Sequence, residues 1–205
     1  MKTRIAVLVS GGGTNLQALI DAEEAGLIPH GEINLVISNN PKAYALERAR
    51  RVGIPAGVLT KQEFGGDQRK FETYLQMALE RDGIDLIILA GFMSILSERF
   101  TSKWPGRILN IHPSLIPSFC GPGFYGLHVH EAVLERGCKV TGATVHFVNE
   151  IPDGGPILLQ KAVEVRADDT PETLQRRVME EAEWKLLPQA AELVSEQIYH
   201  ERKGN

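Results

Sequence analysis

The chain has 205 residues, with 22 basic and 26 acidic side chains and a formal net charge of −4 at pH 7. This length suffices for one α/β domain with a full hydrophobic core and is short for two, so we expect a single domain over residues 1–205. No block of lysine and arginine supplies the basic surface of a nucleic-acid-binding protein. The hydrophobic run in MKTRIAVLVSGGG is too short to span a membrane. We therefore expect small-molecule partners, no nucleic acid, no membrane and a cytoplasmic location.

The first half of the chain alternates short apolar runs with segments of helical periodicity. Strands are expected at residues 4–9, 33–37, 56–59 and 84–89, and helices at residues 16–25, 43–52 and 67–81. The run at 84–89 is almost wholly apolar, which is typical of a strand buried on both faces. This βα alternation predicts a parallel sheet.

The second half of the chain predicts a different strand pairing. A strand at 107–111 precedes a loop rich in Gly and Pro at 118–126 and a helix at 129–136. Strands at 141–148 and 156–165 flank the turn NEIPDGG, which is short enough for an antiparallel hairpin. We therefore predict a Rossmann-like α/β fold: a mixed, mostly parallel central sheet with helices on both faces and an antiparallel C-terminal strand pair.

A long C-terminal helix follows the hairpin. Thr170 is expected to be its N-cap and Pro171 its first residue, and its apolar positions continue through Leu186. Pro188 is expected to kink it. The helix can pack on its own core or on a second subunit in a homodimer, and its pattern does not decide between them.

The turn SGGGTN joins the first strand to the first helix. Glycines allow a ligand close to the backbone, and the helix N-terminus offers free N–H groups and a positive dipole end, so Gly13, Thr14 and Asn15 are candidate phosphate ligands. The alternative is that the glycines only make a tight turn. A dinucleotide is disfavoured because Leu16 replaces the last glycine of G-x-G-x-x-G and Ser38 stands near the expected acidic position. The Walker phosphate-binding pattern is absent as well.

Asn110 and His112 follow the apolar run of the strand at 107–111. Ligands bind outside the carboxyl ends of strands in such sheets, and i, i+2 spacing places both side chains on one face. An amide and an imidazolium aimed at one carbonyl oxygen would stabilise an oxyanion, as acyl transfer requires. Asp153 is the candidate carboxylate that would raise the pKa of His112, although an ordinary Asp-Gly turn explains it equally well.

Metal binding and covalent catalysis are both disfavoured by the motifs. Four histidines lie in one region, but none of the recognised zinc spacings occurs, so we expect no metal. His146 is interpreted as a packed core residue, and His128 and His130 as loop and helix-start residues. G-x-S-x-G is absent, and no activating pattern surrounds Cys120.

Five segments carry a resemblance to a known family: SGGGTNLQALI, SNNPKAYALERA, LAGFMSIL, ILNIHPSLIPSF and VHFVNEIPDGGPILLQ. The chain resembles the phosphoribosylglycinamide formyltransferase family nearly from end to end. The resemblance implies a formyltransferase fold and transfer of formyl from 10-formyltetrahydrofolate to glycinamide ribonucleotide in purine synthesis. It implies a phosphate-binding half at 1–100 and a folate-binding and catalytic half at 101–205.

Individual roles are carried over from this resemblance. It makes Asn110 and His112 the groups that contact the formyl oxygen, with Asp153 assisting proton transfer. It implies that Gly13, Thr14, Asn15 and Glu183 bind the phosphoribosylglycinamide substrate, and that the folate is bound by Arg69, Met93, Ser94, Ile95, Leu96, Asn110, Asn149, Glu150 and Ile151. The chain departs from the family at Ser94, where arginine is common, and in a longer loop at 118–126.

Three other functions share parts of this pattern. Methionyl-tRNA formyltransferase and formyltetrahydrofolate deformylase share the catalytic core, but each carries an additional domain that this sequence does not show. A catalytically silent nucleotide- or folate-binding module is a third reading, because a fold and a phosphate loop do not establish chemistry.

Overall fold

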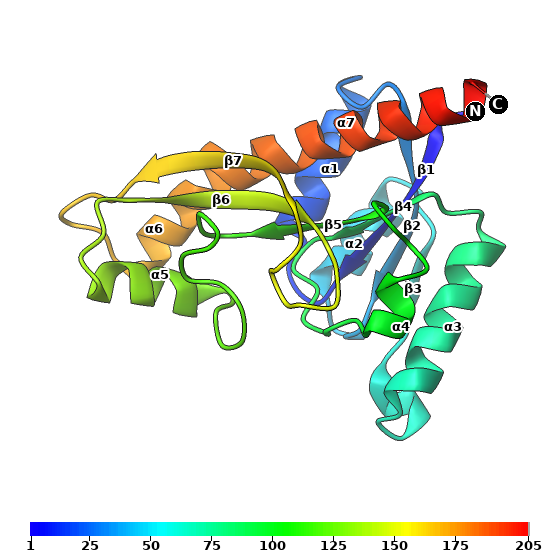
Figure 1. The fold of residues 1–205 in the computed structure, drawn as a ribbon, viewed down its shortest axis with the longest axis horizontal. Helices are drawn as coiled ribbons and strands as arrows, with labels where there is room; N and C mark the ends of the chain where they lie inside the picture. The colour runs from blue at the N-terminus through cyan, green and yellow to red at the C-terminus, as the bar shows by residue number, and fades with distance from the viewer. Residues whose placement is uncertain (205) are drawn as a thin grey trace.

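A computed structural model describes residues 1–204. Its centre is a seven-stranded sheet of order β3-β2-β1-β4-β5-β6-β7 (Figure 1). The strands are β1 (Thr3–Val9), β2 (Gly31–Ser38), β3 (Ala56–Val58), β4 (Leu86–Leu89), β5 (Ile108–His112), β6 (Val140–Phe147) and β7 (Ile157–Glu164). Strands β1 to β5 are parallel, and β6 and β7 are antiparallel additions. The predicted mixed sheet and C-terminal hairpin are confirmed.

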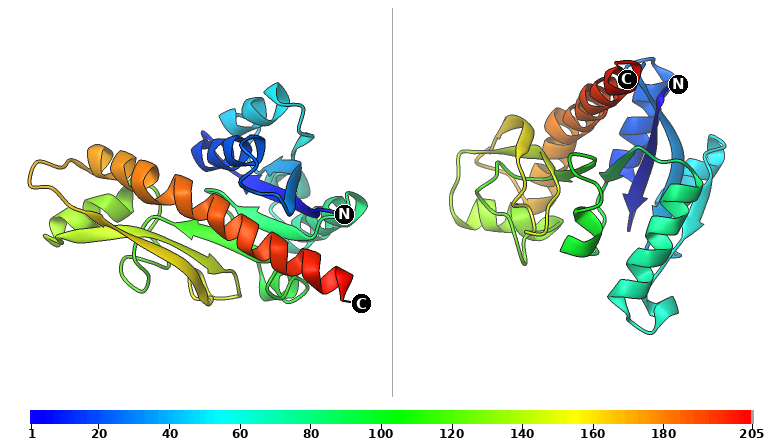
Figure 2. Two further views of the ribbon diagram at one scale, coloured as in Figure 1. Left: turned by 90° about the horizontal axis from the view of Figure 1, so that it is seen from above. Right: turned by 45° about the vertical axis from the view of Figure 1, so that its right-hand side comes forward.

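The helices lie on both faces of this sheet (Figure 2). They are α1 (Thr14–Glu24), α2 (Tyr44–Arg51), α3 (Gln68–Arg81), α4 (Glu98–Thr101), α5 (Leu127–Glu135), α6 (Pro171–Val178) and α7 (Trp184–Lys203), with a 3₁₀ turn η1 (Lys61–Phe64) and a π-helical turn η2 (Met179–Glu183). The short elements α4 and η1 were not predicted, since four residues are too few for a hydrophobic period. No helix within residues 1–204 combines the length and apolar character needed to cross a membrane.

The alternation of side chains along the strands explains why two helical layers are needed. In β1, Ile5, Val7 and Val9 face the core under α1, α2 and α7, whereas Ala6 and Leu8 face the core under α3. All five are fully buried. A strand covered on both faces reads as a continuous apolar run, which is why the sequence predicted central parallel strands.

The C-terminal helix is interrupted one turn earlier than the sequence predicted. Thr170 is the N-cap of α6 and Pro171 its first residue, as expected. The π turn η2 then separates α6 from α7, and Pro188 lies inside α7 without ending it. A proline cannot donate to the carbonyl four residues back, and the irregular turn lies just before the residue that loses this bond. The apolar face of α7 packs on the core of its own chain.

Candidate active site

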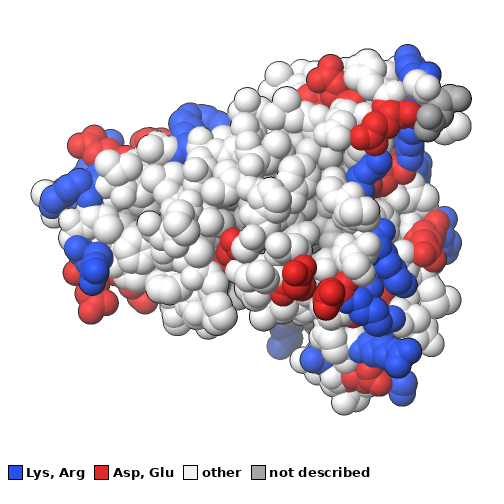
Figure 3. Space-filling view, in the orientation of Figure 1, with Lys and Arg blue, Asp and Glu red and all other residues white. Residues whose placement is uncertain are grey.

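The carboxyl ends of the parallel strands carry the predicted polar residues. The loop after β4, the end of β5, the segment 121–126 and the turn before β7 line one open cavity of about 590 Å³. Its walls include Met93, Ile95, Asn110, His112 and Asp153. The middle of the face drawn in Figure 3 carries few charged side chains, and acidic and basic groups interleave around it.

Asn110, His112 and Asp153 are brought together in this cavity. The Nδ2 atom of Asn110 lies 3.5 Å from Oδ1 of Asp153, and Nδ1 of His112 lies 3.6 Å from its Oδ2. The Gly121 backbone N–H donates to the same Oδ2 at 2.8 Å. Asp153 is therefore more than a turn residue, because its carboxylate faces both of the other predicted catalytic groups.

His146 completes this cluster, and the sequence analysis missed it. It is 2% exposed, so the core interpretation was right about burial, but its Nε2 lies 3.1 Å from Asn110 Nδ2 and 3.6 Å from Asp153 Oδ1. Its Nδ1 donates to the carbonyl of Phe147 at 2.9 Å, which holds the ring with Nε2 toward Asn110 and Asp153. One amide N–H of Asn110 is thus fixed by His146. The other makes only a long contact with Asp153, which a ligand oxygen can replace.

The backbone is strained at two residues that contact His112. Phe119 and Asp153 are the non-glycine residues with positive φ among residues 1–204, at 48° and 54°. The Phe119 carbonyl accepts from His112 Nε2 at 2.8 Å, and Asp153 faces Nδ1. Such conformations are uncommon outside glycine and concentrate at functional sites.

Burial and neighbouring groups together shift the pKa values of His112 and Asp153. Burial lowers the pKa of His112 below its ordinary value, and the Asp153 carboxylate and the Phe119 carbonyl offset this only in part. Asp153 therefore acts in the expected direction on the pKa of His112, but desolvation outweighs it and the pKa stays below its ordinary value. Burial also raises the pKa of Asp153, but His146, His112 and the Gly121 N–H together bring it below its usual range.

The tautomer of His112 follows from its partners. A carbonyl only accepts, so Nε2 carries the proton that bonds to Phe119, and the neutral ring has its lone pair on Nδ1. That basic nitrogen faces Asp153. A proton taken up during a reaction would arrive beside the carboxylate that stabilises it. Burial and Asp153 both raise the pKa of Cys120, which keeps this nearby thiol protonated.

A second set of predicted residues meets at the start of α1. Gly13 precedes the helix with φ of 72°, and a Cβ there would lie 2.6 Å from Cβ of Ala45, so fold alone requires this glycine. At Gly11 and Gly12 a Cβ would meet nothing within 4 Å. Thr14 and Asn15 belong to the first helical turn, whose N–H groups have no intrahelical partner.

Glu183 reaches this turn from the other end of the chain. It ends η2 and accepts a hydrogen bond of 2.7 Å from Asn15 Nδ2. Both side chains are buried, and burial raises the pKa of Glu183 while the bond from Asn15 opposes the change. The Oδ1 atom of Asn15 is buried without a partner. A buried acceptor without a partner at a helix start can receive a ligand donor.

The predicted folate-binding residues separate into two groups. Met93, Ser94 and Ile95 line the cavity, and Met93 and Ile95 are more than half exposed. Ser94 accepts from Asn39 Nδ2 at 2.7 Å, so the serine ties the loop to the end of β2. Leu96 is a buried core residue under α3.

The remaining predicted folate residues lie outside the cavity wall. Asn149, Glu150 and Ile151 precede Pro152 and Asp153, which do line it. Asn149 Oδ1 accepts from the Ile151 N–H at 3.0 Å, which shapes this turn. Arg69 is exposed on α3, one residue after Gln68, whose amide donates to the Ile95 carbonyl at 3.1 Å.

The fold is that of an α/β protein, with a mostly parallel sheet and two antiparallel strands. An amide, two imidazoles and a carboxylate meet at the carboxyl ends of its parallel strands, which is a site suited to acyl transfer. The family model described as formyl transferase matches residues 3–191. A phosphoribosylglycinamide formyltransferase from Haemophilus influenzae is 42% identical over 90% of this chain and 84% of its own length. The chain therefore belongs to the formyl transferase family and, within it, to the phosphoribosylglycinamide formyltransferases.

Other relatives agree in fold and differ in length. The crystal structure of glycinamide ribonucleotide transformylase 1 from Symbiobacterium toebii is 43% identical, with a TM-score of 0.88 over 96% of this chain and 89% of that one. The trifunctional purine biosynthetic protein adenosine-3 of Gallus gallus is 47% identical over 95% of this chain. This chain spans 18% of the length of that relative.

Proposed function

We propose that the chain transfers the formyl group of 10-formyltetrahydrofolate to the amine of 5-phosphoribosylglycinamide, which gives 5-phosphoribosyl-N-formylglycinamide and tetrahydrofolate in cytoplasmic purine biosynthesis. The observation that carries this proposal is the convergence of Asn110, His112 and Asp153 on one cavity in a chain of this family. Two relatives that match it along most of their length are named phosphoribosylglycinamide formyltransferase and glycinamide ribonucleotide transformylase, names that fit the proposed acceptor and the transferred group.

The cavity has the size and lining of a small-molecule site, which supports binding of a folate. Small-molecule sites are commonly 300–1,000 Å³ and mostly apolar with a few placed polar groups. Here Met93, Ile95 and Phe124 supply apolar surface, and Asn110 and His112 supply polar atoms. We propose that the pterin lies against the loop after β4 and the turn before Asp153, and that Arg69 contacts the outer part of the folate.

The phosphoribosyl end of the acceptor is assigned to the start of α1. Its phosphate would accept from the first-turn N–H groups at Gly13, Thr14 and Asn15, favoured by the helix dipole. Glu183, held by Asn15, would receive donors of the glycinamide end. In this proposal residues 1–100 supply the phosphate site and residues 101–205 most of the catalytic and folate site.

The proposed chemistry is direct attack of the neutral amine on the formyl carbon. Asn110, oriented by His146, donates to the developing oxyanion. His112 begins neutral, and its Nδ1 takes the proton that the amine releases, next to Asp153. The resulting imidazolium strengthens the positive field at the oxyanion and then returns the proton as tetrahydrofolate leaves.

A spectroscopic assay with purified protein tests this function. 10-Formyltetrahydrofolate is supplied with and without 5-phosphoribosylglycinamide, and folate product is followed. Product formed only with the amine is the expected result. Product without the amine would indicate a deformylase, and folate binding without turnover would indicate a silent binding module.

A further inference from the structure

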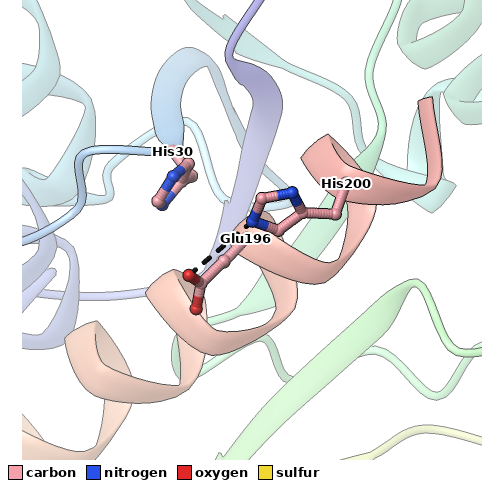
Figure 4. Close-up of side chains that lie close together, drawn as sticks. All are labelled: His30, Glu196 and His200. Carbon is pink, nitrogen blue, oxygen red and sulfur yellow. Dashed lines mark ion pairs between the residues drawn. The ribbon is translucent and has the colours of Figure 1, made fainter. Parts of the chain in front are cut away.

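A separate cluster of metal-ligand side chains lies away from the cavity. His30 is the last residue of the loop before β2, and Glu196 and His200 lie one turn apart on α7 (Figure 4). One candidate ligand atom from each of the three side chains lies within 4.8 Å of the other two. A single ion placed among them could contact all three.

His30 is fixed in position by its neighbours. Its backbone N–H donates to Glu192 Oε2 at 3.2 Å, and its carbonyl accepts from the Thr3 N–H at 2.7 Å. Its ring Nδ1 lies 2.6 Å from Glu192 Oε1. Because an ionised carboxylate only accepts, Nδ1 carries the proton and the neutral ring presents a lone pair at Nε2. A carboxylate behind an imidazole is the arrangement that orients metal-binding histidines.

The other two ligands are presented by a rigid helix. Val194 and Ile198 are buried in the core, and the carbonyl of Ser195 accepts from Thr3 Oγ1 at 2.8 Å, so this part of α7 is tied to β1. Residues four apart lie on one helix face, and His200 Nε2 is 3.9 Å from Glu196 Oε1. These two side chains are 63% and 49% exposed, which leaves room for an ion and a water ligand.

We propose that His30, Glu196 and His200 form a binding site for Zn²⁺ or a similar divalent transition metal ion. Two imidazoles and one carboxylate are a ligand set that zinc uses, with water in the fourth position. Imidazole disfavours Mg²⁺ and Ca²⁺, which prefer oxygen ligands. The expectation of no metal rested on the spacing of ligands along the sequence. Spacing motifs do not detect this set of ligands, because His30 is far from α7 in the chain.

The site lies at the amino-terminal ends of the parallel strands, and the catalytic cluster lies at their carboxyl ends. His30 precedes β2, and the eight residues of that strand extend roughly 25 Å toward the carboxyl ends of the strands, where the cavity opens. A bound ion would join the loop before β2 to the C-terminal part of α7. Its effect is therefore on stability, and formyl transfer proceeds without it.

Metal titration of the untagged, chelator-treated full chain tests the site. Isothermal calorimetry with ZnCl₂, and the visible absorption of Co²⁺ displaced by Zn²⁺, should both give one ion per chain in wild type, and Zn²⁺ should raise Tm. His200→Ala should abolish this uptake and the Tm rise, and because the side chain is mostly exposed the variant should still fold. Glu192→Gln should weaken binding by about 10- to 100-fold, because it alters the support of His30.

Glu201→Gln is the matched control. It removes a charge from the same helix, but this carboxylate bonds to Arg107 Nη2 at 2.7 Å and belongs to no ligand set proposed here. It should bind Zn²⁺ as wild type does. Absence of uptake by wild type, or uptake that His200→Ala leaves unchanged, would overturn the proposal, the latter by placing the ion at other histidines.

Discussion

His112 is the residue on which the proposed chemistry depends most. In the proposed mechanism, replacing it with alanine removes the group whose Nδ1, next to Asp153, accepts the proton and which later stabilises the oxyanion. We expect the turnover number of His112→Ala to fall by about 100- to 1,000-fold, as when one oxyanion donor is removed, with KM for both substrates changed much less. Steady-state kinetics on protein with a wild-type circular dichroism spectrum measures this. An unchanged turnover number would remove His112 from the mechanism.

Asp153 affects the same imidazole through its charge. Burial lowers the pKa of His112, and the carboxylate is the largest influence that raises it. In Asp153→Asn this influence is gone while an acceptor for the Gly121 N–H is kept. The pKa of His112, followed by NMR titration of its ring, should therefore lie below 6.5 in wild type and lower still in the variant. A value that stays the same or rises would contradict the assignment of Asp153.

In the glycine-rich turn before α1, Gly13 is needed for the fold, whereas Gly12 can be changed to test ligand binding. At Gly13 a Cβ would lie 2.6 Å from Ala45 Cβ and φ is positive, so Gly13→Ala should destabilise the protein. At Gly12 a Cβ meets nothing within 4 Å, so Gly12→Ala should keep the wild-type Tm. If phosphate binds here, Gly12→Ala should raise KM for phosphoribosylglycinamide and leave KM for the folate unchanged. Equal effects on both KM values would argue against a phosphate site.

An element can be predicted from the sequence when nearby residues along the chain determine it, and cannot when contacts between distant segments determine it. The strands, the Thr170 cap and the hairpin β6–β7 could be read from periodicity and turn residues. His146 could not, because its place beside Asn110 is set by the register of β5 against β6, where the two residues are direct partners. The interruption at η2 lies before Trp184, whose carbonyl loses its partner at Pro188, whereas the sequence placed the kink at the proline itself. Arg69 came from family resemblance alone, and its role stays a prediction.

At the scale of the whole molecule, one sheet joins the two halves of the chain. Strands from both halves of the chain are adjacent at β4 and β5, and Asn15 bonds to Glu183 across nearly the whole sequence. The polar cluster at the cavity is buried and costs stability unless its bonds are made. Two of its buried imidazoles, His112 and His130, have a lowered pKa, so their protonation is linked to folding.

His130 makes this linkage measurable. It is fully buried on α5, neither ring nitrogen has a hydrogen-bond partner, and burial lowers its pKa to about 4. The unfolded value is about 6.5, so between pH 6.5 and pH 4 the unfolded chain binds more protons, and stability falls as the pH falls through this window. The loss attributable to this one histidine is up to about 3 kcal/mol, and the lowered pKa of His112 acts in the same direction.

Urea unfolding at pH 7.5, 6.5, 5.5 and 4.5 would measure the effect. We expect His130→Leu to lose markedly less free energy of unfolding between pH 6.5 and pH 4.5 than wild type, because an apolar side chain has no proton to bind. His128→Leu makes the same chemical change at an exposed position in the same helix and should keep the wild-type slope. Parallel slopes for wild type and His130→Leu would mean that the buried ring is protonated as readily in the folded protein as in the unfolded chain.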